Sequence, residues 1–174
     1  MKLKNFTPVP LSDTDIPAPD CVLIYADGAC KGNPGPGGWA ATARVYAGGA
    51  LVKAKTLVGG EDDTTNNQME ILAALEAIKL TAEGKERPIV VRTDSKYLVR
   101  SANDWLPGWI AKGWRKSDGK PVLNRELLEQ LASTLATRSV SFEHVPGHAG
   151  NAGNEEVDGL ASTEATKRAR RRVA

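Results

Sequence analysis

The sequence predicts a single α/β domain built on a mixed five-stranded sheet flanked by helices. Three observations carry this prediction. Apolar residues make up 41% of the 174 residues, which is enough for one core, while the chain is too short for two well-buried ones. Two glycine-hinged strand-like runs follow a buried one, which indicates a three-strand antiparallel meander. A later apolar run follows a helical stretch, as a parallel strand does after a crossover helix.

An extended lead-in is expected before the meander. Residues 1–20 hold four prolines among polar residues and lack a sustained period. The run 21–27 reads as a buried strand, and the glycine- and proline-dense stretch 28–38 reads as a loop. Residues 39–47 and 50–58 are then two strands that meet at a Gly-Gly hinge. The function-bearing part of the chain is therefore expected to begin near Cys21.

The second half alternates helices with parallel strands. Residues 67–80 have helical periodicity, with an alanine face that allows close packing on the sheet. Residues 103–124 are unusual because they combine three tryptophans with several basic side chains. The remaining expected elements are a strand at 88–94, a helix from Ser95, a helix at 125–136, a strand at 139–145, a glycine-rich loop at 146–153 and a helix from about Asn154.

Charge and cysteine usage limit the functional classes. The 23 basic and 21 acidic residues give a net charge of +2, but five of the basic ones lie in the last eight residues, so the body carries about −3. Bulk charge therefore does not indicate a nucleic-acid binder, and any such role must come from local patches. Cys21 and Cys30 bracket one strand-like run and cannot reach each other, so both are expected to be reduced. No apolar run approaches membrane-spanning length and no secretory signal is evident, which predicts a soluble, cytoplasmic protein.

Four acidic residues stand at expected element ends: Asp27, Glu70, Asp94 and Asp158. If the strands that end at Asp27 and Asp94 are parallel neighbours, the two carboxylates emerge side by side at the carboxyl edge of the sheet. Clustered carboxylates repel one another, and a fold that gathers them neutralises them with hard cations. With no cysteine and little histidine nearby, the donor set suits Mg²⁺ or Mn²⁺ rather than Zn²⁺.

Each of these residues also has an ordinary structural explanation. Asp27 before a glycine can start a turn, and Glu70, three residues after Asn67, matches a capping box. Asp94 can cap the helix that follows it, and Asp158 can face solvent. The functional interpretation depends on whether the four converge in space.

Five motifs are similar in order and spacing to type I ribonuclease H of bacteria. They are Tyr25–Trp39, Thr64–Glu70, Thr93–Tyr97, Gly147–Gly150 and Asn154–Asp158, within a resemblance that runs from about Cys21 to Ala165. The resemblance implies the ribonuclease H-like fold for a catalytic domain at 21–165. It also implies that this domain carries a basic protrusion at about 103–124 and is followed by a basic tail at 166–174.

The resemblance also implies an activity. The enzyme would be a metal-dependent endonuclease that hydrolyses the RNA strand of RNA–DNA hybrids and leaves 5′-phosphate and 3′-hydroxyl ends. Asp27, Glu70, Asp94 and Asp158 would bind two Mg²⁺ ions, with Mn²⁺ as an alternative, and His148 would be a mobile auxiliary residue for proton transfer or product release. For His148 the alternative is a loop histidine without a role. A monomer is expected.

Residues that contact the substrate are likewise implied by the resemblance. Asn33, Asn66 and Asn67 would contact 2′-hydroxyls or minor-groove edges, which distinguish RNA from DNA, although all three also suit turns and caps. Thr65 and Asn124 would hold a phosphate of the DNA strand, while Tyr97, Trp105 and Ser117 would line a channel for its sugars. The substrate-binding set is completed by Cys30 and the protrusion cations Lys112, Arg115, Lys116 and Lys120.

The sequence departs from the family pattern in its basic residues. Ile110, Ala111 and Leu123 stand where lysine or arginine often occurs, and Asp63 replaces an arginine that supports the phosphate pocket. These changes bear on affinity more than on activity. Trp109 and Trp114 are expected to pack the protrusion itself.

Two other functions are open from the sequence. One is a non-catalytic hybrid-binding module, although all four carboxylates are present. The other is processing of a different nucleic acid on the same fold, as integrases and resolvases do. The tail is either a solvated helix end or a source of phosphate attraction.

Overall fold

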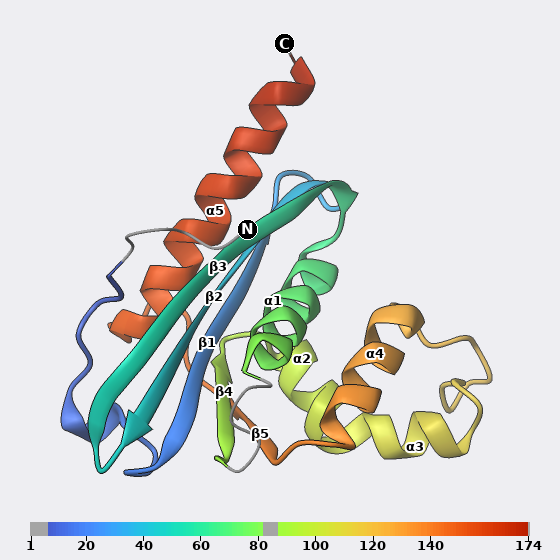
Figure 1. The fold of residues 1–174 in the computed structure, drawn as a ribbon. Coiled ribbons are helices and arrows are strands. Elements are labelled where there is room, and N and C mark those ends of the chain that lie inside the picture. Colours follow the sequence, from blue (N-terminus) through green and yellow to red (C-terminus); the bar gives the residue numbers. More distant parts are fainter. Residues whose placement is uncertain (1–6, 82–86, 174) are drawn as a thin grey trace.

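The computed structural model describes residues 7–81 and 87–173, so the first six residues of the expected lead-in and the last residue of the tail lie outside the described part. One five-stranded sheet forms its centre, in the order β3-β2-β1-β4-β5 (Figure 1). The first three strands pair antiparallel, and β4 pairs parallel with both β1 and β5. The strands are β1 Cys21–Cys30, β2 Gly35–Ala47, β3 Ala50–Thr64, β4 Ile89–Thr93 and β5 Val140–His144. The predicted mixed sheet and meander are confirmed.

Helices cover both faces of this sheet. Figure 1 shows α1 on one face and α5 on the other, while α2, α3 and α4 form a separate lobe beside β4 and β5. A π-helical turn at Ser101–Trp105 joins α2 to α3 without a break. The helices are α1 Asn66–Leu80, α2 Lys96–Arg100, α3 Leu106–Ala111, α4 Arg125–Leu135 and α5 Ala152–Val173, and a short 3₁₀ turn lies at Asp13–Asp15.

Burial on both faces explains the continuous apolar character of β1. Because side chains alternate along a strand, Val22 and Ile24 point into the core beneath α1. Leu23 and Tyr25 point into a second core beneath α5. The central strand is thus covered on both sides, as parallel-neighbour strands usually are.

The meander is longer than predicted because its glycines belong to strands. Residues 28–38 were expected to form a loop, but β1 continues to Cys30 and β2 already begins at Gly35. A Cβ atom on Gly38 would lie 2.4 Å from the carbonyl oxygen of Ala161 in α5. Glycine is thus required here by close helix packing rather than by a turn. β3 also runs on to Thr64 rather than ending at residue 58.

The described part of the lead-in is docked rather than merely extended. Val9 donates its backbone N–H to Glu156 Oε1 at 2.8 Å, and its carbonyl accepts from Arg44 Nη1 at 2.5 Å. Arg44 Nη2 and Glu156 Oε2 form an ion pair at 2.7 Å, with side chains 1% and 3% exposed. Leu11 and Ile16 pack on the core beneath α5. Residues 7–20 therefore strap α5 to β2.

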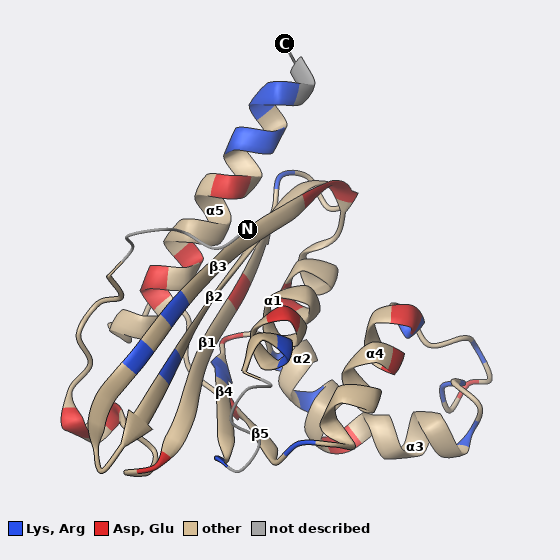
Figure 2. Cartoon of the chain, in the orientation of Figure 1, with Lys and Arg blue, Asp and Glu red and all other residues tan. Residues whose placement is uncertain are grey.

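The basic tail is part of α5, which continues to Val173. Arg168 bonds to Glu164 one turn earlier at 3.0 Å and to Asp62 on β3 at 3.2 Å. Figure 2 shows Lys and Arg positions gathered in the last turns of α5, where the helix extends past the sheet. The tail is an ordered helical arm.

Candidate active site

Asp27 and Asp94 meet where β1 and β4 run parallel. Tyr25 pairs with Arg92, so Asp27 in β1 stands level with Asp94, which directly follows the last residue of β4. Asp27 is only 5% exposed, and its Oδ1 accepts the Gly28 N–H at 2.7 Å. A Cβ on Gly28 would come within 2.5 Å of the Glu70 nitrogen, which is why a glycine follows Asp27. Asp27 lies inside β1 and does not start a turn.

Glu70 is brought to Asp27 by the first turns of α1. The capping box of this helix is formed by Thr65 and Gln68, so the suggested pairing of Asn67 with Glu70 is wrong. The Glu70 side chain instead accepts hydrogen bonds from Asn66 Nδ2 at 2.7 Å and from Ser95 Oγ. Ser95, not Asp94, caps α2 by accepting from the Leu98 N–H at 3.1 Å. Neither Glu70 nor Asp94 therefore caps a helix.

Asp158 completes the cluster from α5. Because this helix begins at Ala152 rather than near Asn154, Asp158 lies in its second turn. Its side chain is 33% exposed, and Oδ1 accepts from Ser162 Oγ at 3.4 Å. In the first turn of α5, the fully buried Asn154 donates from Nδ2 to Asp94 Oδ2 at 3.3 Å. The start of α5 thus contacts the β4 end of the site.

The pKa values of two carboxyls report this convergence. Burial, and after it the negative charges of Asp94, Asp158 and Glu70, together raise the pKa of Asp27 to about 8 against the opposing Gly28 hydrogen bond. Burial also raises the pKa of Glu70 to about 7, with Asp94 adding to the effect and the Ser95 and Asn66 hydrogen bonds opposing it. All four predicted acidic residues therefore belong to one electrostatic cluster.

The donor set fits hard divalent cations. It consists of carboxylate oxygens, and neither of the two cysteines of the chain takes part. Among the described residues, no three of these side chains yet close around one point as ligands. The charge repulsion that raises the Asp27 pKa is the interaction that bound cations would relieve.

His148 lies beside this cluster on the loop before α5. Its Nδ1 is 3.7 Å from Asp158 Oδ2, and its side chain is 83% exposed. His148 has a backbone φ of 52°, a conformation that residues other than glycine seldom adopt. Its neighbour Gly147 has no room for a side chain, because a Cβ there would lie 2.6 Å from Asp94 Oδ2. His148 is therefore close to the acidic cluster without being packed into it.

The residues implied for the RNA strand, together with Thr65 and Cys30, gather around the start of α1. Asn33 Oδ1, in the loop between β1 and β2, accepts the Asn66 N–H at 3.1 Å, and Asn67 is exposed nearby in the first turn. Thr65 is the N-cap of the helix. The Cys30 thiol donates to backbone carbonyls, of which the nearest is Gly32 at 2.7 Å. Both cysteines are unpaired, as predicted.

The residues implied for the DNA strand line one groove in the α2–α4 lobe. This groove has a volume of about 510 Å³. The rings of Tyr97 and Trp105 meet edge to face with centroids 6.2 Å apart, and Asn124 Nδ2 donates to the Tyr97 hydroxyl at 3.2 Å. Six of the residues predicted for the DNA strand line this groove: Tyr97, Trp105, Lys112, Arg115, Lys116 and Ser117. Lys120 lies outside this lining and pairs with Asp118 at 3.5 Å.

The tryptophans of this lobe have mixed roles. Trp114 packs against the core and lies under the Arg125 guanidinium, 5.9 Å from it. Trp109 also packs on the core, but it lines the groove and contacts Trp105 with the two rings tilted by 48° and their centroids 5.4 Å apart. Its assignment to packing alone was therefore incomplete. Ile110 and Leu123, which replace basic residues, are 52% and 67% exposed.

Two residues that hold the acidic cluster were not predicted. In the sequence, Ser95 marks only the expected start of a helix, and Asn154 only the start of a motif and of the last helix. Ser95 bonds to Glu70 from 25 positions away, and Asn154 bonds to Asp94 from 60 positions away. Such long-range contacts leave no local pattern in a single sequence.

Within the described ranges, no helix combines the length and apolar character needed to cross a bilayer.

Comparisons with known proteins agree on one family. The family model described as RNase H matches residues 19–166. A ribonuclease H of Stutzerimonas stutzeri is 50% identical over 145 residues, covering 82% of this chain and 90% of the relative. A ribonuclease H of Cyanothece sp. is 46% identical over 145 residues, covering 83% and 89% of the two chains.

Solved structures agree with this result. The crystal structure of LC9-RNase H1, described as a type 1 RNase H with the type 2 active-site motif, is 31% identical with a TM-score of 0.75. It covers 88% of this chain and 75% of its own. LC11-RNase H1, solved in complex with an RNA/DNA hybrid, is 24% identical with a TM-score of 0.61 and covers 84% and 97% of the chains. The second likeness concerns the fold alone.

Proposed function

This chain belongs to the ribonuclease H family and is a ribonuclease H, and from this premise we propose that it hydrolyses the RNA strand of RNA–DNA hybrids. We propose a two-metal-ion mechanism that leaves 5′-phosphate and 3′-hydroxyl ends. The observation that carries the mechanism is the convergence of Asp27, Glu70, Asp94 and Asp158 at one edge of the sheet. Two of these carboxyls have raised pKa values because they are buried among like charges. Ribonucleases H depend on divalent metals, and the oxygen donors favour Mg²⁺, with Mn²⁺ as the alternative.

The four carboxylates would hold the metal ions between β1, α1, β4 and α5. Bound there, divalent cations supply charge stabilisation for the attacking and leaving oxygens of a phosphodiester. The chain's own contribution is to keep the carboxylates in place. Ser95 and Asn66 fix the two oxygens of Glu70, Gly28 fixes Asp27, and Asn154 fixes Asp94. Asp27, the most buried of the set, would be the central ligand.

His148 would act from the rim of the site. Its high exposure and glycine-flanked loop leave it free to move, and its Nδ1 already faces Asp158 at 3.7 Å. A neutral imidazole can accept a proton or be displaced with the product. We therefore assign it to proton transfer or product release rather than to fixed metal coordination.

The two groups of substrate residues would straddle the acidic cluster. Asn33, Asn66 and Asn67 would read the RNA strand in its shallow minor groove, where 2′-hydroxyls are displayed. The groove of the α2–α4 lobe, with Tyr97 and Trp105 among basic side chains, would take the DNA strand. Thr65 and Asn124 would hold one of its phosphates, and Cys30 would be a further substrate contact. The relatives named ribonuclease H, 46% and 50% identical to this chain, support the choice of substrate. We also propose that the protein acts in the cytoplasm as a monomer.

A digestion panel tests the proposal. End-labelled RNA–DNA hybrid, duplex RNA, duplex DNA and both single strands are incubated with Mg²⁺, with Mn²⁺ or with a chelator, and the product ends are identified by mass spectrometry. We expect cleavage of hybrid RNA alone, only with metal, and with 5′-phosphate ends. Cleavage of duplex DNA instead would favour an integrase-like or resolvase-like role, and tight binding without cleavage would favour a binding module.

A further inference from the structure

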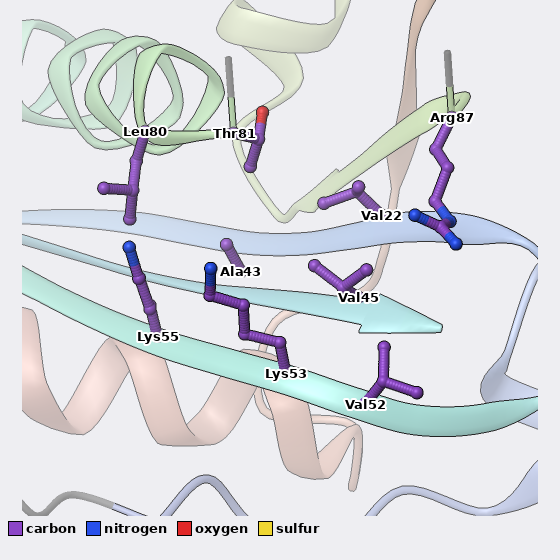
Figure 3. A pocket seen from close by; sticks show the side chains of 9 residues that line it. All are labelled: Val22, Ala43, Val45, Val52, Lys53, Lys55, Leu80, Thr81 and Arg87. Carbon is purple, nitrogen blue, oxygen red and sulfur yellow. The ribbon is translucent and has the colours of Figure 1, made fainter. Parts of the chain in front are cut away.

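A second pocket lies at the opposite end of the sheet from the acidic cluster. It has a volume of about 310 Å³ and opens on the face that α1 covers (Figure 3). Val22 pairs with Val45 and Val45 with Lys53, so these three residues form one row across β1, β2 and β3. Because α1 ends at Leu80, the helix does not extend over this row, and the pocket lies beyond the end of the helix.

Three positive side chains surround an apolar floor. The floor is made by Val22, Ala43, Val45 and Leu80, and Figure 3 shows Lys53 and Lys55 rising from β3 on one side with Arg87 entering from the other. Lys53 and Lys55 share a face with Val45 and Ala43, their cross-strand partners, which contact the core. No acidic side chain of the described residues lines this pocket.

Ordinary structural roles explain only part of this arrangement. Lysines on an edge strand discourage pairing with other chains, and β3 is an edge strand. That role does not account for Arg87, which comes from the far side and whose buried Nε has no hydrogen-bond partner among the described residues. A buried donor without an acceptor is costly, and a ligand with acceptor oxygens in the pocket would supply one. Nor does it account for Val52, an apolar lining residue that is 59% exposed.

We propose that this pocket binds a nucleoside monophosphate, with its phosphate between Lys53, Lys55 and Arg87 and its base on the apolar floor. A phosphate monoester carries nearly two negative charges at neutral pH and offers three acceptor oxygens, which suits a pocket bordered by three cations. The volume lies at the lower end of small-ligand pockets, about 300 to 1,000 Å³, which favours one base and one phosphate over a dinucleotide. The same chemistry occurs at the 5′-phosphorylated end of an RNA strand, which is a second source of the ligand.

The test is an NMR titration of the isotope-labelled full chain in the presence of a chelator, so that metal-bound nucleotide does not report on the acidic cluster. Adenosine monophosphate should shift the amide signals of Val22, Val45 and Lys53 in a saturable way, and a 5′-phosphorylated dinucleotide that does the same would identify the strand end as a source. Adenosine or inorganic phosphate should each bind at least about tenfold more weakly, because each lacks one half of the contacts.

Matched charge variants locate the binding. The double variant Lys53→Gln/Lys55→Gln should weaken binding by roughly tenfold for each cation removed, the factor expected for losing a hydrogen bond to a charged group. The control Arg100→Gln/Arg125→Gln removes the same charge from exposed positions outside the pocket lining and should bind as the wild type does. Absence of saturable shifts, equal binding of inorganic phosphate or adenosine, or unchanged binding by the double variant would each overturn the proposal.

Discussion

Replacing Asp27 by asparagine should stabilise the metal-free protein while it abolishes metal-dependent cleavage. Asparagine keeps the Oδ1 that accepts the Gly28 N–H and removes the charge that is buried beside Asp94, Asp158 and Glu70. The two effects have one origin, because the charge that would bind the metal is the charge that destabilises the fold without it. This coupling makes Asp27→Asn the most informative single change in the chain.

The magnitude follows from the pKa of Asp27, which burial raises from the ordinary 3.8 to about 8 in the folded protein. A carboxyl with a raised folded-state pKa holds its proton more tightly when folded, so stability falls as pH rises from the unfolded to the folded pKa. Each pKa unit is worth about 1.36 kcal/mol, so the advantage of Asp27→Asn over the wild type should grow by about 4 kcal/mol between pH 5 and pH 8. Above pH 8 the advantage should stay level.

Urea denaturation followed by circular dichroism at pH 5, 7 and 9, with a chelator, measures this advantage. A difference of this size corresponds to roughly 10 °C in melting temperature for a chain of this length. Added Mg²⁺ should stabilise the wild type and narrow the gap, because ligand binding to the folded state adds stability. Intact-mass measurement checks that the new amide, which is followed by Gly28, has not reverted to aspartate. A pH-independent difference, a less stable variant at pH 9, or near wild-type cleavage would refute the reasoning.

Three further changes test other parts of the structure. His148→Ala should lower turnover on a hybrid substrate without altering the metal requirement, since the imidazole lies at the rim of the site; complete inactivity with metal binding intact would show that the histidine is essential. Deleting residues 167–174 should weaken hybrid binding at low salt and flatten its salt dependence by about 0.9 in slope per lost phosphate contact, with saturated cleavage unchanged. Because Arg168 also pairs with Asp62, a variant that keeps Arg168 and replaces Lys167, Arg170 and Arg171 with glutamine tests the charge alone. If fluorescence-anisotropy titrations give this variant the same slope of log affinity against log salt as the wild type, the tail is a solvated helix end. Glu156→Gln should lower the free energy of unfolding, measured in urea, by about 3–5 kcal/mol, because it leaves the buried Arg44 charge without its partner. The control Glu129→Gln breaks the exposed Arg125–Glu129 pair and should change the free energy of unfolding very little.

The sheet was predictable because its signals are local. Strand-like runs, the Gly48-Gly49 hinge and the crossover helix each leave a pattern within a few residues, and together they determine the strand order. The same locality misled the prediction at residues 28–38. Glycine and proline ordinarily mark turns, but Gly28 and Gly38 lie in strands because α1 and α5 approach too closely for a side chain.

The acidic cluster was predictable from topology combined with family resemblance. Parallel pairing of β1 with β4 brings Asp27 beside Asp94, and the motifs supply Glu70 and Asp158. The hydrogen bonds that position these carboxylates were not predictable, because Ser95 and Asn154 reach partners far away in the sequence. The pocket at the other end of the sheet also had no sequence signal, since its cations come from β3 and from the residue two positions before β4.

The strap formed by residues 7–20 shows that the folded domain is larger than the region shared with the family. The family match begins at residue 19 and ends at residue 166, yet Val9 and Arg168 both lie outside these limits and hold α5 in place from its two ends. A chain trimmed to the shared region would keep every acidic ligand. It would also leave Arg44 Nη1 without its carbonyl acceptor and uncover the core contacts of Leu11 and Ile16. The acidic cluster thus lies entirely within the shared region, whereas part of what holds the helix that carries Asp158 lies outside it.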